Sequence, residues 1–160
     1  MILQSHQTNA TLQLGQQLAT LLKPGMVLAL DGDLGAGKTV ISRGIARGLN
    51  ITEPVTSPTF TVVQEYKLPN CHDQWLYHLD MYRINDSEAA LAFGIDEYLF
   101  ARNAITLVEW PERISDLLQD DQQFTIKLSH IDEETRQIEI PDFFQEGLLH
   151  AGIPESIKLL

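Results

Sequence analysis

The stretch MVLALDGDLGAGKTVISRGIARGL, residues 26–49, decides the fold class. Its first five residues, Met26–Leu30, form a short apolar run, which is typical of a strand buried on both faces of a parallel sheet. Its last ten residues, 40–49, have the pattern of a helix. A buried strand that passes through a glycine-rich loop into a helix predicts an α/β protein.

The loop Gly32–Thr39 matches the phosphate-binding pattern G-x-x-x-x-G-K-[ST]. Glycines let the backbone curl so that successive N–H groups point at phosphate oxygens, and the following helix adds the positive end of its dipole. Lys38 would reach the β- and γ-phosphates of a nucleotide, and Thr39 would ligate Mg²⁺. The residues predicted to contact the nucleotide are Gly32, Asp33, Leu34, Gly35, Ala36, Gly37, Lys38, Thr39 and Val40.

Two carboxylates are candidates to complete such a site, which needs an acidic group beside the metal at the end of a neighbouring strand. Glu109 directly follows the apolar run 104–108, at the sheet edge where α/β proteins bind ligands. Asp80 lies in a predicted strand, 75–84, where alternation places it on one face with His78. The predicted catalytic residues are Lys38, Glu109 and Asp80, and the predicted metal ligands are Thr39, Glu109 and Asp80.

The sequence leaves open which of the two carboxylates touches the metal, and each residue also has a plainer interpretation. Glu109 could be a solvent-facing glutamate at the start of a helix, and Asp80 could lie on the wetted face of an antiparallel strand. His78 is interpreted as a structural histidine. The loop Thr56–Thr61 could carry a hydroxyl to the metal or the γ-phosphate, or it could be a rigid connection into a strand.

The composition restricts the class of protein. The chain has 160 residues, which predicts one domain over residues 1–160. Its 22 acidic and 11 basic residues give a net charge of −11, which argues against direct binding to DNA or RNA and against an anionic membrane surface. A single cysteine, no apparent signal peptide and no apolar run of bilayer length predict a soluble, cytoplasmic protein.

The rest of the chain completes an α/β pattern. Two strand-like segments joined by turn residues, 60–68 and 75–84, predict an antiparallel hairpin, so the sheet cannot be wholly parallel. The other predicted elements are a helix at 8–22 capped by Thr8 or Asn9, one or two helices at 86–100 interrupted at Gly94, a strand at 104–110, a helix from Pro111, strands at 124–131 and 135–141, and a weak helix after 142. We predict a three-layer α/β P-loop NTPase fold with a mixed parallel and antiparallel sheet.

Four sequence blocks together resemble the bacterial TsaE family, formerly YjeE. The blocks are GDLGAGKT (32–39), SPTF (57–60), HLDMYR (78–83) and LVEWPER (107–113). The resemblance extends from the first predicted helix to the strand pair ending at 141, so it covers nearly the whole chain. The combination is far more specific than any single block.

The resemblance implies a function and a set of roles. Members of this family are small P-loop ATPases that use ATP and Mg²⁺ and are needed for N6-threonylcarbamoyladenosine at position 37 of tRNAs that read ANN codons. They act with the partners TsaD and TsaB, and they meet the tRNA only through these partners. A separate enzyme makes the intermediate threonylcarbamoyl-AMP, and ATP hydrolysis by TsaE supports turnover rather than the transfer itself.

The resemblance also carries roles to single residues. Lys38 and Thr39 take the nucleotide and metal roles, with ATP or ADP as the ligand. Glu109 takes the place of a Walker-B acid, and Asp80 is the other carboxylate of the site. The further residues that the resemblance implicates are Thr59 and Thr61 in a switch-like loop and Thr11 near the nucleotide base.

Three other functions remain alternatives at this point. A small-molecule kinase would need arginines gathered over the transferred phosphoryl group, but the six arginines are scattered from residue 43 to residue 136. A GTPase would carry N-K-x-D and D-x-x-G motifs, which the chain lacks. A scaffold that binds nucleotide without hydrolysing it would share the phosphate loop.

Overall fold

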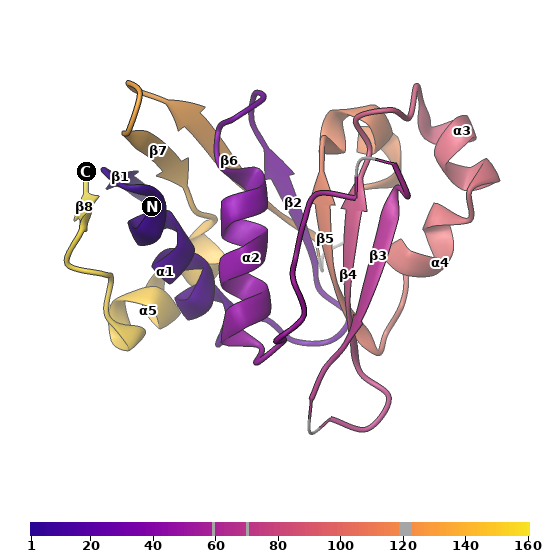
Figure 1. Cartoon of the computed structure of the whole chain (residues 1–160), viewed down its shortest axis with the longest axis horizontal. Coiled ribbons are helices and arrows are strands. Elements are labelled where there is room, and N and C mark those ends of the chain that lie inside the picture. The colour runs from indigo at the N-terminus through magenta and orange to yellow at the C-terminus, as the bar shows by residue number, and fades with distance from the viewer. Residues whose placement is uncertain (59, 70, 119–122) are drawn as a thin grey trace.

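The computed structural model describes residues 1–58, 60–69, 71–118 and 123–160 (Figure 1). The strands are β1 (Ile2–Ser5), β2 (Val27–Asp31), β3 (Val63–Lys67), β4 (Trp75–Asp80), β5 (Ala104–Glu109), β6 (Gln123–His130), β7 (Arg136–Glu139) and β8 (Ile157–Leu159). They form one sheet in the order β3-β4-β5-β2-β6-β7-β1-β8. The four neighbours β4, β5, β2 and β6 are parallel, whereas β3, β7, β1 and β8 join by antiparallel pairing. The predicted mixed sheet is therefore confirmed.

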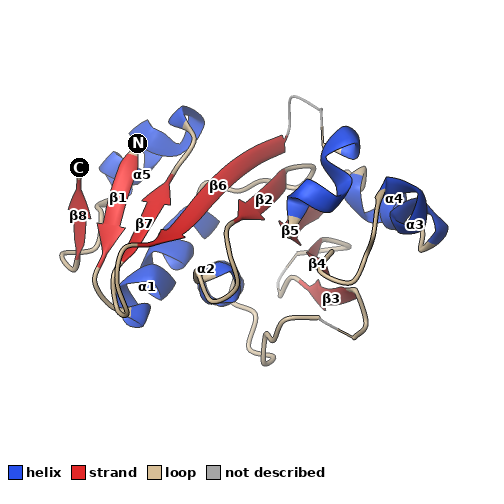
Figure 2. Ribbon diagram, turned by 90° about the horizontal axis from the view of Figure 1, so that it is seen from above, coloured by secondary structure: helices blue, strands red, loops and turns tan. Residues whose placement is uncertain are grey.

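Helices cover both faces of this sheet. They are α1 (Thr8–Ala19), α2 (Lys38–Gly48), α3 (Ser87–Ala92), α4 (Ile95–Leu99), α5 (Asp142–Ala151) and the 3₁₀ helix η1 (Pro111–Leu117). Figure 2 shows α1 and α2 on one side of the sheet and α3 and α4 on the other side of its far end. Side chains of α1, α2 and α5 share one buried cluster with the sheet, and those of α3, α4 and η1 share a second.

The side chains of strand β2 show that the sheet is buried on both faces. Leu28 and Leu30 point into the cluster formed with α1 and α2, whereas Val27 points into the cluster formed with α3, α4 and η1. All three side chains are buried, as the uninterrupted apolar run predicts. The phosphate loop therefore leaves the carboxyl end of a central strand, which is a rigid place for a site.

Two glycines bring α1 against α2. A Cβ atom on Gly44 of α2 would overlap the carbonyl oxygen of Leu12 and crowd the Cα of Gly15, both in α1. Only glycine at this crossing allows the two helix backbones to approach so closely. A Cβ atom on Gly37, directly before α2, would lie 3.9 Å from the Thr11 side chain, so the first part of α1 lies beside the end of the phosphate loop.

The structure corrects several sequence predictions at the ends of elements. The strand β1 and the edge strand β8 were not predicted, because each is very short and neither has a long apolar run. Helix α1 begins after Gln7, so Thr8 and Asn9 lie in its first turn instead of capping it. The predicted helix from Pro111 is confirmed, and it is a 3₁₀ helix. The break at Gly94 is confirmed, since it separates α3 from α4.

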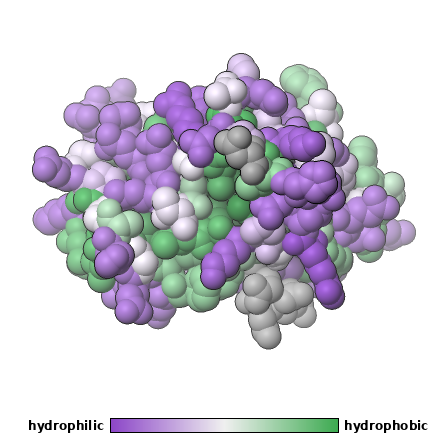
Figure 3. Space-filling model, turned by 90° about the horizontal axis from the view of Figure 1, so that it is seen from below, coloured by the Kyte–Doolittle hydropathy of each residue, from purple (hydrophilic) through white to green (hydrophobic). Residues whose placement is uncertain are grey.

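Two further observations concern the molecular surface. Among the described residues, no helix is both long and apolar enough to cross a bilayer. Figure 3 shows the end of the molecule opposite the phosphate loop, where hydrophobic residues extend from the centre to the lower left margin and hydrophilic residues lie mainly above and to the right.

Candidate functional site

The phosphate loop joins the carboxyl end of β2 to the first turn of α2. Gly37 occupies the N-cap position of α2 with φ of 109°, in the left-handed region that favours glycine. Because glycine has no side chain to cap the helix, the first N–H groups of α2 are left for a ligand at the loop. Such a helix start is suited to bind an anion.

Lys38 folds back over the loop in this structure. Its Nζ donates hydrogen bonds to the carbonyl oxygens of Gly32 and Asp33, the latter at 2.9 Å. The ring of Trp110 covers the same ammonium, with its centroid 4.0 Å from Nζ. Burial lowers the pKa of the Lys38 amine, and nearby carboxylates, with Glu109 first, oppose that shift. A positive group is thus held, largely desolvated, at the mouth of the loop.

The Glu109 side chain is shielded from solvent and lies beside the start of α2. It is buried at the end of β5, and its carboxylate accepts a hydrogen bond from the Thr39 hydroxyl, 3.1 Å from Oε1 and 3.4 Å from Oε2. Nε2 of His78 lies 2.8 Å from Oε1 of the same carboxylate. The solvent-facing alternative for Glu109 is therefore wrong.

Asp80 ends β4 directly beside Glu109, because the two residues pair in the parallel register of β4 and β5. Its carboxylate is buried and accepts hydrogen bonds from the Ser57 hydroxyl and from the backbone N–H of Tyr82, the latter at 2.9 Å. The alternative of a wetted strand face is wrong here as well. Ser57, in the loop before β3, therefore brings a hydroxyl to the site.

These groups surround a cavity of about 430 Å³, which we call the strand-side cavity. It is lined by Leu34, Gly35, Gly37, Lys38, Thr39, Val40, Ser57, Asp80, Tyr82, Glu109 and Trp110. Its hydroxyl and carboxylate oxygens are the hard donors that Mg²⁺ prefers. The donor set at the carboxyl ends of β4 and β5 therefore fits this metal.

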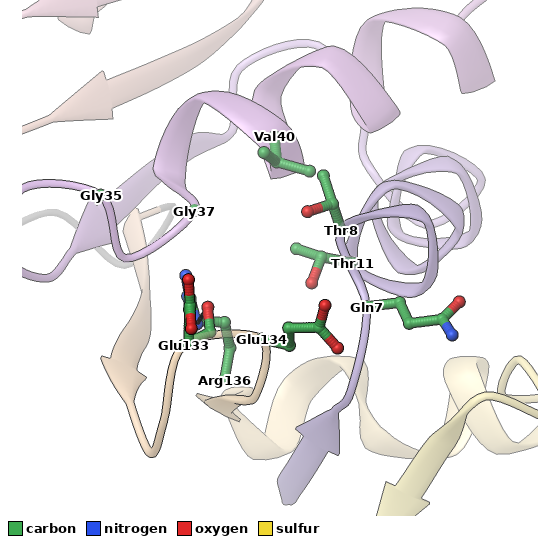
Figure 4. Close-up of a pocket in the computed structure, with 9 residues that line it drawn as sticks. All are labelled: Gln7, Thr8, Thr11, Gly35, Gly37, Val40, Glu133, Glu134 and Arg136. Carbon is green, nitrogen blue, oxygen red and sulfur yellow. Dashed lines mark hydrogen bonds between the residues drawn. The ribbon is translucent and has the colours of Figure 1, made fainter.

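A second cavity, of about 220 Å³, lies on the other side of the phosphate loop, and we call it the turn-side cavity (Figure 4). It is lined by Gln7, Thr8, Thr11, Gly35, Gly37, Val40, Glu133, Glu134 and Arg136. Figure 4 shows Thr11 of α1 and Glu134 of the β6–β7 turn facing one another, whereas Gln7 points away. The Thr11 side chain is buried, and its hydroxyl lies 2.8 Å from that of Ser5.

The predicted site residues do not all reach a cavity wall. Gly32 and Asp33 offer their carbonyls to Lys38 instead, and the Ala36 side chain is buried in the core. Thr61 is exposed in the turn before β3, and the predicted residue Thr59 lies outside the described residues.

Sequence reasoning missed part of both walls. Tyr82 and Trp110 lie inside the blocks HLDMYR and LVEWPER, so the blocks themselves were the available signal. Glu133, Glu134 and Arg136 come from a turn with no motif, and only the fold brings them to the loop.

Comparisons with known proteins agree with the geometry. The family model described as "Threonylcarbamoyl adenosine biosynthesis protein TsaE" matches residues 5–138. Proteins named tRNA threonylcarbamoyladenosine biosynthesis protein TsaE match from Synechocystis (48% identity; 68% of this chain and 69% of the relative covered) and from Bacillus subtilis (47%; 72% and 70%). A relative of the same name from Nostoc is 39% identical and covers more of both chains, 84% of this one and 81% of its own.

A solved structure supports the same assignment. The crystal structure of Bacillus subtilis YdiB superposes with a TM-score of 0.71 at 29% identity, over 94% of this chain and 93% of that one. The predicted family resemblance and α/β fold are thus confirmed. The chain belongs to the TsaE family, whose role is in the biosynthesis of threonylcarbamoyladenosine in tRNA.

Proposed function

We propose that the chain is a Mg²⁺-dependent P-loop ATPase that binds and slowly hydrolyses ATP, and that it acts with TsaD and TsaB in forming N6-threonylcarbamoyladenosine at position 37 of tRNAs that read ANN codons. The observation that carries the proposal is the strand-side cavity. There a buried lysine, a P-loop threonine and two buried carboxylates meet at an uncapped helix start.

Binding of the phosphates is assigned to the loop. The N–H groups at the start of α2 would bind phosphate oxygens, and Lys38 would leave the carbonyls of Gly32 and Asp33 to reach them. The Trp110 ring, which now covers Nζ, would have to move aside. Nucleotide binding is therefore expected to change the environment of Trp110.

Hydrolysis is assigned to the strand ends. Thr39, Glu109 and Asp80 would hold the metal directly or through water, and Mg²⁺, when bound, neutralises charge on the phosphate oxygens. Glu109 would orient the attacking water and accept its proton. Asp80, through its bond with Ser57, would link the site to the loop before β3.

The nucleoside is assigned to the turn-side cavity. That cavity shares Gly35, Gly37 and Val40 with the strand-side cavity, so a nucleotide whose phosphates lie on the loop can place its sugar and base there. Thr11 is the proposed contact of the α1 wall.

Two observations support the proposed partners: membership of the TsaE family and the net negative charge of the chain. A net charge of −11 suits a protein surface with basic patches better than it suits tRNA, so the tRNA would be met only through TsaD and TsaB. Cytoplasmic location follows from the same proposal. Co-purification from cells, with and without ATP, is expected to recover the TsaD–TsaB pair.

The decisive experiment replaces Lys38 with alanine. Charge-assisted hydrogen bonds contribute about 1.5–3 kcal/mol each, so Lys38→Ala is expected to weaken binding of MgATP about 10²-fold or more in calorimetry. With TsaD, TsaB, tRNA and threonylcarbamoyl-AMP, wild type would support repeated rounds of modification and Lys38→Ala would not. Lys23→Ala, at an exposed lysine outside both cavities, is the control and should behave as wild type.

Other outcomes would contradict the proposal. If Lys38→Ala supported repeated rounds of modification, ATP binding would be dispensable. A strong preference for GTP over ATP in competition binding would exclude ATP as the nucleotide that the chain binds. Phosphorylation of nucleosides or sugars at the turnover of a kinase would favour a small-molecule kinase.

A further inference from the structure

His78 is a fully buried side chain that makes one polar contact within the part of the chain that the structure describes. It lies on β4, and its Nε2 is 2.8 Å from Glu109 Oε1. Its other ring nitrogen, Nδ1, is buried and has no hydrogen-bond partner among the described residues. A leucine would fill similar space without burying an unpaired nitrogen, so the imidazole is explained by what Nε2 does for Glu109.

The two oxygens of Glu109 are held unequally. Oε1 receives His78 at 2.8 Å and the Thr39 hydroxyl at 3.1 Å, whereas Oε2 has only the longer 3.4 Å contact with the same hydroxyl. With the carboxylate as the acceptor, this contact requires the His78 tautomer that carries its proton on Nε2. The carboxylate is therefore anchored through Oε1, and Oε2 is the freer oxygen.

The sheet makes this contact rigid. His78 and Asp80 share one face of β4, and β4 is paired on both sides, with β3 and with β5. In the parallel register His78 stands beside Leu107 and Asp80 beside Glu109, so the imidazole reaches diagonally to the carboxylate. Groups placed on paired strands hold their geometry better than groups on loops.

We propose that His78 is a positioning residue of the ATPase site: its Nε2–H anchors Glu109 Oε1 beside Thr39 and so leaves Oε2 for the metal and its water. The inference rests on the proposed function, which it deepens. Groups that orient a metal ligand through a hydrogen bond change metal affinity or activity by about 10- to 100-fold when they are removed.

Two substitutions separate positioning from packing. His78→Leu replaces the imidazole with an apolar side chain of similar size and so removes the hydrogen-bond donor. His78→Gln restores an N–H donor near the position of Nε2. Leu76→Val, on the same face of β4 two residues earlier, is the matched control, because it disturbs the core of that strand without touching Glu109.

The readouts are the Mg²⁺ concentration for half-maximal ATP hydrolysis, kcat, and the affinity for ADP in EDTA. His78→Leu is expected to need about 10-fold more Mg²⁺ and to lose about 10-fold or more in kcat, with ADP affinity in EDTA unchanged. His78→Gln should recover most of both losses, and Leu76→Val should show neither. Normal Mg²⁺ dependence and kcat in His78→Leu, or no recovery in His78→Gln, would overturn the proposal.

A measurement on the nucleotide-free protein tests the contact itself. The ¹⁵N spectrum of the imidazoles, with the His78 signals assigned by their loss in His78→Leu, should show the Nε2–H tautomer and should shift in Glu109→Gln. A proton on Nδ1, or no response to Glu109→Gln, would also overturn the proposal. If wild type bound no ATP the proposed function would fail, whereas this spectrum would still decide the contact between His78 and Glu109.

Discussion

The two cavities beside the phosphate loop are built in different ways. In the strand-side cavity, Asp80 and Glu109 are buried at the ends of paired strands, and their carboxylates are hydrogen-bonded to other residues. In the turn-side cavity, Glu133 and Glu134 are exposed on the β6–β7 turn. Buried, held charges suit a step in which charge develops, whereas exposed side chains suit adjustable binding. Substitutions in the two cavities should therefore affect different kinetic constants.

The largest effect on catalysis is expected from Glu109→Gln. Loss of a general base costs about 10²- to 10⁴-fold, so kcat should fall by that factor, while the affinity for ADP in EDTA, which does not involve the metal, changes little. Steady-state hydrolysis and calorimetry measure the two quantities. Glu155→Gln, at an exposed glutamate outside both cavities, is the control.

The comparison between the carboxylates is sharpened by Asp80→Asn. If Asp80 acts mainly through Ser57, this variant should lose less kcat than Glu109→Gln. Equal losses would mean that both carboxylates act at the metal. If Glu109→Gln still bound nucleotide and supported normal cellular function, hydrolysis would be dispensable, which would favour a nucleotide-binding scaffold.

The next effect concerns the packing of α1 against α2. Gly44→Ala would force α1 away from α2, and overpacking of this kind costs about 1–3 kcal/mol. For a chain of this size that lowers Tm by roughly 2–4 °C for each kcal/mol. Because α1 carries Thr11, the affinity for ATP should fall by a larger factor than kcat does.

Thermal unfolding followed by circular dichroism measures the loss of stability. Arg47→Ala, at an exposed position of α2, should change Tm little and is the control. An unchanged Tm in Gly44→Ala would show that the helices can separate without cost.

A smaller effect is expected from the turn-side cavity itself. Thr11→Val and Glu134→Gln each remove one hydrogen-bonding group, which is worth about 0.5–1.5 kcal/mol, or about 2- to 10-fold in the Kd for ADP. Binding of inorganic pyrophosphate, which needs only the loop, should not change. A fall in kcat without a change in Kd would contradict the division between the cavities.

The sequence predicted best what depends on neighbours along the chain. The order strand, loop and helix over 26–49 is local, and so is the alternation that places His78 and Asp80 on one face of β4. Strand β1 is different, because it is stabilised by pairing with β7 more than 130 residues later. A four-residue segment such as Ile2–Ser5 carries no pattern long enough to reveal such a partner.

The same distinction holds within the candidate site. Glu109 was predicted because a carboxylate directly after a predicted strand marks the ligand edge of a sheet, whereas Asp80 was predicted from the face that it shares with His78 inside the predicted strand 75–84. Glu134 was not, since a turn becomes a cavity wall only when β6, β7 and α1 are assembled. His78 was assigned a structural role because sequence alone cannot show that its ring meets Glu109 at 2.8 Å.

The smallest predicted effect lies outside both cavities and provides a reference for them. The Tyr98 hydroxyl of α4 donates a hydrogen bond to Glu65 of β3 at 2.7 Å, and this bond, more than burial, raises the pKa of Tyr98 from 10.0 to about 12. Because the folded pKa is the higher one, the stabilisation is fully present below pH 10 and is lost as the pH rises toward 12. Tyr98→Phe should therefore lower the free energy of unfolding by about 0.5–1 kcal/mol at neutral pH, and the difference from wild type should shrink above pH 10. Urea denaturation across this range measures it, and ATP hydrolysis should stay unchanged. Loss of hydrolysis in Tyr98→Phe would show that the β3–α4 contact and the strand-side cavity are coupled.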